Sequence, residues 1–289
     1  MNYIVVTNTY KRQLYLVERS LRASLKQIPA PSAVFLLDQN EVEVKLPADI
    51  ADNSLFKHVR VLKNSVSAAR NSIEIPAGTD WLFFCDDDGY FCDDYTERFF
   101  KILKDNPLLE IVAGSIVRED NNDYYSYRHK IGGSLKHFKN TKNLMGSNFA
   151  IRAKTFDELG RFDEKFGVGS YWGSGEETDF CWQAFFSKKE MEFFPELIVY
   201  HIPPFNESIR IGFKKAFRYG VGKGALVWKW LVVKRKPAVF YELAEMFAVP
   251  FVQAARGLLS FKFQLVINNA GIFAGRVFGL IKAAFVGKF

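Results

Sequence analysis

Short apolar runs alternate with helix-like segments along the first 115 residues, and this alternation limits the possible folds more than any other feature. Helices are expected at residues 14–27, 67–75 and 95–104, where apolar residues recur at helical spacing or a proline ends the segment. Strands that alternate with helices build a mostly parallel sheet with helices on both faces. The sequence therefore predicts an α/β fold. Its strands are expected at residues 3–7, 33–37, 59–62, 81–84 and 110–113.

The next part of the chain is less regular. Residues 118–148 are polar and rich in Tyr, Asn, Lys and Gly, which is typical of loops. Helices are expected at residues 149–159 and 174–188, and a strand-like apolar run follows at residues 197–200. The composition changes after Pro203-Pro204, so we expect a domain boundary there. The predicted parts are a main domain, 1–204, with halves of about 1–115 and 116–204, and a helical region, 205–289.

The charge of the chain is unevenly distributed. The net charge is +7, but residues 205–289 hold 14 Lys and Arg against 3 Asp and Glu, a net charge of +11. Residues 1–204 hold 25 basic and 29 acidic side chains, a net charge of −4. Basic segments attract nucleic acids or anionic membranes, so residues 205–289, here called the tail, need their own explanation.

Basic and aromatic residues interleave in this tail, as in Trp228-Lys229-Trp230, and its apolar residues fall at helical intervals. Basic amphipathic helices of this kind lie in the membrane interface. No nucleic-acid-binding module is recognised, so we expect no nucleic acid as a partner. Uncharged stretches reach about a dozen residues, short of the about 20 that a spanning helix needs, so no transmembrane helix is expected. The alternative is that these helices pack on the main domain or on a sister subunit in a homo-oligomer.

The cysteines and the N-terminus indicate the compartment. Cys85, Cys92 and Cys181 have neither metal-binding nor paired spacing, which suits a reducing environment. The N-terminus lacks the pattern of a signal peptide and begins directly with a strand. We therefore expect a cytoplasmic protein, bound peripherally to the inner face of the cell membrane.

Three adjacent carboxylates, Asp86, Asp87 and Asp88, follow the apolar run at residues 81–84. They repel one another and resist burial, and a divalent cation would remove that penalty. Mg²⁺ and Mn²⁺ prefer oxygen ligands and bind one or two carboxylates together with substrate phosphates. In an extended stretch Asp86 and Asp88 can face the same ion. The alternative is a solvated acidic loop at the end of a strand.

A second acidic group follows a glycine-rich loop. Trp172-Gly173-Ser174-Gly175 leads into Glu176 and Glu177, at the start of the helix expected at residues 174–188. Carboxylates stabilise a helix N-terminus through the helix dipole, yet one on such a rigid platform can also be the general base for a hydroxyl. His201 follows the run at 197–200, and a lone His in this place is more often structural than a metal ligand.

Six motifs in this order resemble the inverting glycosyltransferases of family 2, of the bacterial surface-polysaccharide type. The resemblance covers roughly residues 2–204 and implies the GT-A fold, a Rossmann-like, mostly parallel sheet with helices on both faces. One departure concerns the usual Glu-Asp pair of the family, which is Glu176-Glu177 here. The motifs are Val5 to Arg12, Leu37-Asp38-Gln39-Asn40, Ser67-Ala68-Ala69-Arg70-Asn71, Asp86-Asp87-Asp88, Gly146 to Arg152 with Gly160-Arg161-Phe162-Asp163-Glu164, and Glu176-Glu177-Thr178-Asp179.

The resemblance also implies roles for individual residues. Glu177 would be the catalytic base, with Glu176 as the less favoured candidate. Asp86, Asp88 and His201 would hold Mn²⁺ or Mg²⁺. The donor would be bound by Thr7, Asn8, Tyr10, Asp38, Arg70, Asp86 and Asp87, with Asp38 on the base. The acceptor or sugar would be bound by Asn148, Trp172 and Asp179, although Trp172 could equally be a packed loop aromatic.

The predicted function is transfer of a hexose, with inversion, from a UDP-sugar to a hydroxyl of a lipid-linked or polysaccharide acceptor. UDP-galactose is one candidate donor, and the setting would be the synthesis of a surface polysaccharide, O-antigen or glycolipid. The alternatives are a metal-dependent sugar nucleotidyltransferase and a non-catalytic membrane-bound scaffold with a transferase fold. The first would typically show a glycine-rich phosphate loop near the N-terminus, and residues 7–12 contain no glycine.

Overall fold

The computed structural model describes residues 1–63, 65–203, 208–287 and 289. The chain divides into two compact units. The first consists of Met1–Phe162 and Phe180–Pro204, and the second of Asp163–Asp179 and Phe205–Phe289. The domain boundary expected at residue 204 lies outside the described residues.

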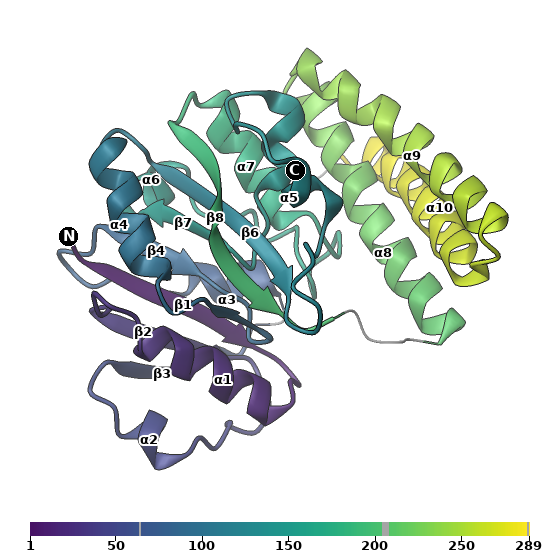
Figure 1. Ribbon diagram of the computed structural model, residues 1–289. Coiled ribbons are helices and arrows are strands. Elements are labelled where there is room, and N and C mark those ends of the chain that lie inside the picture. Colours follow the sequence, from purple (N-terminus) through teal and green to yellow (C-terminus); the bar gives the residue numbers. More distant parts are fainter. Residues whose placement is uncertain (64, 204–207, 288) are drawn as a thin grey trace. The chain divides into compact units, whose positions relative to one another are not determined.

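A mixed sheet of eight strands forms the centre of the first unit (Figure 1). The strand order is β3-β2-β1-β4-β7-β6-β8-β5. Strands β1 to β4 pair in parallel, as do β6 and β8, whereas β7 and β5 pair with their neighbours in antiparallel fashion. The strands are β1 (Tyr3–Thr9), β2 (Ala33–Asp38), β3 (Phe56–Arg60), β4 (Trp81–Phe84), β5 (Gly89–Phe91), β6 (Ile111–Arg118), β7 (Phe149–Arg152) and β8 (Met191–His201).

Helices cover both faces of this sheet, which confirms the predicted fold class. Alternate strand residues point to opposite faces, and each face buries its own apolar cluster. Helices α1 (Leu14–Leu25) and α4 (Tyr95–Asp105) contribute to one cluster. Helices α3 (Val66–Asn71), α6 (Ala153–Glu158) and the second half of α7 (Glu176–Phe186) contribute to the other.

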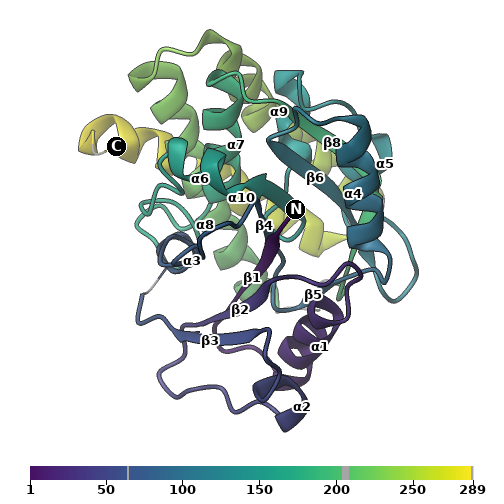
Figure 2. The same cartoon turned by 90° about the vertical axis from the view of Figure 1, so that its left-hand side faces the viewer.

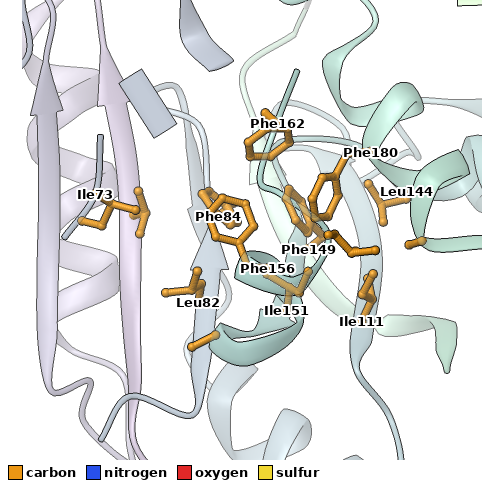
Figure 3. Close-up of a cluster of buried hydrophobic side chains, with 14 of the residues drawn as sticks. Ile73, Leu82, Phe84, Ile111, Leu144, Phe149, Ile151, Phe156, Phe162 and Phe180 are labelled. Atoms are coloured by element: carbon orange, nitrogen blue, oxygen red, sulfur yellow. The ribbon is translucent and has the colours of Figure 1, made fainter. Parts of the chain in front are cut away.

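A group of phenylalanine rings in the second of these clusters gathers around the end of β4 (Figure 3). Phe84 of β4 stacks on Phe149 of β7, with ring centroids 4.8 Å apart. Phe156, Phe162 and Phe180 surround this pair. The cluster thus fixes the end of β4, which leads directly into the acidic triplet.

Short helices complete the first unit. In both views α2 (Ala48–Ala51) lies beside β3 at the edge of the sheet (Figures 1 and 2). The other two are α5 (Tyr127–Ile131) and the 3-10 helix η1 (Phe138–Asn143).

The prediction of a helix at residues 149–159 was wrong in its first part. Residues Phe149–Arg152 form β7, between β4 and β6, and the helix α6 begins only at Ala153. A short apolar run fits a buried strand as well as a helix, so its pattern alone could not decide. Hydrogen bonds from two neighbouring strands, which are remote in sequence, favour the strand.

The helical part of the second unit contains three long helices, α8 (Ile209–Trp228), α9 (Phe240–Leu259) and α10 (Phe263–Val286). A π-helical turn, η2 (Lys229–Val233), and a 3-10 turn, η3 (Pro237–Val239), connect α8 to α9. Helix α10 packs against both α8 and α9 (Figure 1).

Glycines four residues apart bring α8 and α10 unusually close together. A Cβ atom added to Gly224 of α8 would lie 2.2 Å from the carbonyl oxygen of Arg276, and one added to Gly275 of α10 would lie 2.1 Å from that of Phe217. Gly220 and Gly279 have the same kind of contact with the facing backbone. Small residues at this spacing let two helix backbones approach closely, a packing mode common between membrane helices.

Two C-terminal segments, Pro237–Leu259 and Phe263–Val286, are long and apolar enough to cross a membrane by length and composition. Only 22% and 28% of their apolar windows are buried. The expectation that no segment would reach this length was therefore wrong. The reason is that only uncharged stretches were counted, whereas the helices continue past the charged residues that end those stretches, such as Glu245 in α9 and Arg276 in α10.

Candidate active site

The acidic triplet and His201 meet at one end of the sheet. Asp86 to Asp88 follow β4 after a single residue, Cys85, and the pairing of β5 with β8 places Gly89 opposite His201. His201 Nε2 consequently lies 2.9 Å from Asp88 Oδ1. Asp86, Asp88 and His201 each offer one ligand atom, and these three atoms lie within 4.8 Å of one another.

Burial and the charge of Arg12 have opposite effects on the pKa of Asp87 and Asp88. Asp87 and Asp88 are 5% and 7% exposed. Arg12 donates to both of them, over 2.8 Å to Asp87 and 2.9 Å to Asp88, and the Thr9 hydroxyl donates to Asp87 over 2.7 Å. Burial nevertheless raises the pKa of Asp87 to about 6. Negative charge is therefore only partly compensated here.

Asp88 and His201 shift each other's pKa. Burial alone would raise the pKa of Asp88, but the contact with His201 and the charge of Arg12 hold it below its ordinary value. Burial would lower the pKa of His201, and Asp88 raises it above its ordinary value. Two carboxylates and one imidazole form a ligand set of oxygen and nitrogen atoms that fits Mn²⁺ or Mg²⁺.

Arg70 faces the triplet from α3. Its Nη2 atom donates to Asp86 Oδ1 over 3.1 Å and to the carbonyl of Gly146 over 3.3 Å. The guanidinium is 2% exposed and lies over the rings of Phe84 and Phe162. The end of the sheet thus carries a fixed positive group beside Asp86, whose side chain is 35% exposed.

Asp38, the residue predicted to contact the nucleotide base, is enclosed by its own loop and by two side chains of β3. Its side chain is fully buried. Its Oδ1 atom accepts from the backbone and side chain of Asn40, and its Oδ2 atom accepts from Val44 N and Arg60 and contacts His58. Burial would raise the pKa of Asp38, but these donors lower it. In this arrangement the carboxylate closes the loop after β2, and neither oxygen is exposed to a nucleotide base.

The remaining predicted donor and sugar residues differ in their exposure. Tyr10 is 53% exposed and Asn8 is half-buried, whereas the side chain of Thr7 is fully buried within β1. Asn148 is also fully buried. It accepts from the Tyr95 hydroxyl and donates to backbone carbonyls of β6 and β8, at Ser115 and Leu197. These contacts connect the start of β7 to β6 and β8.

The segment Asp163–Asp179 of the second unit, here called the acidic loop, carries the predicted base. Gly173 and Gly175 have φ angles of +77° and +96°, a region that favours glycine. Glu176 is buried and Glu177 half-buried, both in the first turn of α7. Of the two, Glu177 is the more accessible to a substrate.

Asp179 and Trp172 of the acidic loop are both 1% exposed. Asp179 accepts from Lys229 Nζ over 2.7 Å and from Trp230 Nε1 over 2.6 Å. The indole of Trp172 is stacked with Phe289, with ring centroids 5.7 Å apart. These contacts favour positioning and packing over direct binding of an acceptor.

Sequence reasoning missed four residues that contact the candidate groups. Thr9 and Arg12 follow the predicted first strand within a few residues, and their place at its carboxyl end was the available signal. Lys229 and Trp230 were interpreted only as part of the basic, aromatic tail. Their partner Asp179 lies about 50 residues earlier in the chain, so the sequence carried no local signal of this contact.

Comparisons with known proteins identify the family and the fold. The family model described as glycosyl transferase family 2 matches residues 4–221. The comparison with curated proteins finds no match. Among solved structures, the chain is similar to the mannosyltransferase PcManGT from Pyrobaculum calidifontis in complex with GDP-Man and Mn²⁺. The TM-score is 0.64 at 15% identity, over 99% of this chain and 88% of that one.

Two further structures share the fold over part of their length. TarS of S. aureus matches with a TM-score of 0.55 at 15% identity, over 80% of this chain and 40% of that one. GalNAc-T7 with UDP, GalNAc and Mn²⁺ matches with a TM-score of 0.57 at 14% identity, over 80% and 48%. Because the family model matches most of the chain, the protein belongs to glycosyltransferase family 2, whose members transfer a sugar from a nucleotide-sugar donor.

Proposed function

We propose that this enzyme transfers a hexose from a UDP-sugar, with inversion and with Mn²⁺ or Mg²⁺, to a hydroxyl of a lipid-linked or polysaccharide acceptor. The observation that carries the proposal is the group of Asp86, Asp88 and His201, whose ligand atoms lie within 4.8 Å of one another. The Mn²⁺ ions in the structures of PcManGT and GalNAc-T7 support a divalent cation. Family membership favours transfer of a sugar over transfer of a nucleotide.

The chain's own groups suit an inverting displacement. Asp86, Asp88 and His201 would hold the cation, which, when bound, supplies Lewis-acid stabilisation of the leaving diphosphate. Arg70, fixed beside Asp86, adds positive charge on the same side. Glu177 would accept the proton of the acceptor hydroxyl as that oxygen attacks the anomeric carbon. Attack opposite to the departing diphosphate inverts the anomeric centre.

The identity of the donor's nucleotide base is the part of this proposal that the contacts support least. Asp38 is engaged by its own loop, so recognition of uracil would rely on other groups, such as the exposed ring of Tyr10. PcManGT binds GDP-Man and GalNAc-T7 binds UDP. A donor screen must therefore contain both bases.

The test is transfer or hydrolysis with a panel of UDP- and GDP-hexoses, including UDP-galactose. We expect release of nucleoside diphosphate from a UDP-hexose with Mn²⁺ and loss of that release in excess EDTA. Asp88→Asn keeps the size of the side chain and should abolish release while the thermal unfolding temperature stays within a few degrees of wild type. Full activity in EDTA would contradict the metal requirement. Activity with GDP-hexoses alone would contradict uracil as the nucleotide base of the donor.

The tail supports association with a membrane surface. The turn between α9 and α10 exposes large apolar side chains next to cations: Leu259 is 83% and Phe261 80% exposed, and Arg256 and Lys262 flank them. Each Lys or Arg near an anionic bilayer contributes about 1 kcal/mol, and apolar side chains add attraction that salt does not screen. A lipid-linked acceptor would be presented at such a surface.

Sedimentation with vesicles of phosphatidylserine and phosphatidylcholine tests this part. We expect binding that high salt reduces only in part, and weaker binding for Phe261→Glu. Leu108→Glu, at a side chain that is 79% exposed in the first unit, is the matched control and should bind as the wild type does. Equal binding of both variants would instead favour a packing or oligomerisation role for the tail.

A further inference from the structure

One lysine of the tail holds both ends of the acidic loop. Lys229 Nζ lies 2.8 Å from Asp163 Oδ2 and 2.7 Å from Asp179 Oδ2, and these two carboxylates are the first and last residues of the loop. Lys229 is 6% exposed and its ammonium also lies over the ring of Phe166, 5.0 Å from the centroid. A single buried cation thus closes a loop that contains the glycines and the candidate base.

The backbone around Lys229 is adapted to this contact. Helix α8 ends at Trp228, and the π-helical turn η2 begins at Lys229. The amide of Lys234 donates to the carbonyl of Lys229 over 2.8 Å, the i to i+5 bond of that turn. Short π-helical turns are rare and frequently occur at functional sites. Here the turn also lets the next residue, Trp230, donate its indole N–H to Asp179 over 2.6 Å.

The loop has a second fixed contact with the tail. A Cβ atom added to Gly222 of α8 would lie 2.2 Å from the hydroxyl of Ser174 and 2.5 Å from its carbonyl oxygen. The Ser174 hydroxyl donates to the carbonyl of Tyr219 over 3.1 Å. Ser174 lies between the two glycines with positive φ and two residues before Glu176. The glycine-rich turn is therefore seated directly on α8.

From these contacts we propose that Lys229 is a positioning residue, which fixes the acidic loop so that Glu177 keeps its orientation for proton transfer. The inference rests on the proposed function of Glu177. Asp179 follows Glu177 by two residues in the first turn of α7, so a displacement of its carboxylate rotates that turn. Misplacement of a reacting group by about 1 Å can lower a rate roughly 100-fold. The tail consequently acts on turnover as well as on membranes.

The test compares Lys229→Met with Lys229→Arg, in detergent, so that membrane binding does not enter. The probe is release of nucleoside diphosphate from the nucleotide-sugar that the donor screen identifies, with water as the acceptor. We expect Lys229→Met to lower kcat roughly 10- to 100-fold at an unchanged donor KM. Lys229→Arg should recover most of this loss, since its guanidinium can also bridge two carboxylates.

Lys189→Met is the matched control. Lys189 also bridges two carboxylates, Glu110 at 2.9 Å and Glu158 at 2.7 Å, but all three residues belong to the first unit and none to the acidic loop. Its loss should leave kcat and KM unchanged. Wild-type kcat in folded Lys229→Met, or an equal loss of kcat in Lys189→Met, would overturn the proposal.

A fourth variant covers the case in which Lys229→Met does not fold. Asp163→Asn removes one of the two ion pairs at a side chain that is 23% exposed, and should lower kcat roughly threefold to tenfold with a normal unfolding temperature. Unchanged turnover in this variant would overturn the proposal as well. Failure of the wild type to release diphosphate from any donor would instead contradict the proposed function, which separates the two results.

Discussion

The contact between α8 and α10 predicts that Gly275→Ala destabilises the protein, although alanine is the better helix former. The added Cβ atom would lie 2.1 Å from the carbonyl oxygen of Phe217, 0.9 Å inside the 3.0 Å that such contacts essentially never go below. The facing atom belongs to the backbone, so no side chain can turn away. The two helices must therefore move apart along their length.

Two opposing terms set the magnitude. Overpacking of this kind costs about 1–3 kcal/mol, and a rigid neighbour justifies the upper end. Replacement of glycine by alanine within a helix stabilises the helix by about 1 kcal/mol. The net loss is then about 2 kcal/mol. In a chain of this size 1 kcal/mol corresponds to about 2–4 °C, so the unfolding temperature should fall by about 4–8 °C.

Thermal unfolding followed by circular dichroism, in the same detergent for each variant, measures this loss. Ala274→Leu is the control, because Ala274 is the neighbouring residue of α10 and is exposed. Its larger side chain should leave the unfolding temperature within about 2 °C, as is usual for surface substitutions. A Gly275→Ala protein as stable as the wild type, or more stable, would show that the helices are not packed on their glycines.

Three further predictions concern single side chains. Glu177→Gln should lower kcat by roughly 10²–10⁴ while calorimetry shows normal donor binding; if only Glu176→Gln is inactive, the base is the neighbouring residue. His201→Ala should raise the Mn²⁺ concentration needed for half-maximal activity, whereas a merely structural His would lower only the unfolding temperature. Burial lowers the pKa of His129 to about 4, so the unfolded chain takes up a proton on this side chain below pH 6.5 and the folded chain does not until about pH 4. Stability should fall across that window by up to about 3 kcal/mol, and urea unfolding at pH 7 and pH 4.5 should show a smaller fall for His129→Gln.

The sequence predicted those parts of the fold that depend on local pattern. The parallel strands β1, β2 and β4 are short apolar runs that end in polar residues or shortly before them, so their type could be predicted directly. Strand β7 could not, because its assignment depends on partners that are remote in sequence. The helical spacing of apolar residues in the tail was recognised, but its short uncharged stretches did not reveal α9 and α10 as long apolar helices, since a single charged residue does not end a helix.

The candidate site was predicted to a similar extent. A run of three carboxylates at the end of a strand has few structural explanations, so Asp86 to Asp88 stood out from composition and position alone. The buried state of Asp38 depends on how the loop after β2 folds back onto it, which no local pattern reveals. Lys229 is 50 residues from Asp179, and a pairing over that separation leaves no periodic signal in the sequence.

The place of His201 in the sheet has a consequence for biosynthesis. His201 is the last residue of β8, and β8 lies between β6 and the edge strand β5. The carboxylates of Asp86 and Asp88 leave the ribosome more than 100 residues earlier. Strand pairings over long separations form late, because their loop-closure entropy is large. In a nascent chain, the acidic triplet therefore lacks the neighbouring imidazole of His201 until the sheet is complete. Binding of Mn²⁺ by all three groups would report that the last strand has been inserted, and a fragment that stops before β8 would lack that signal.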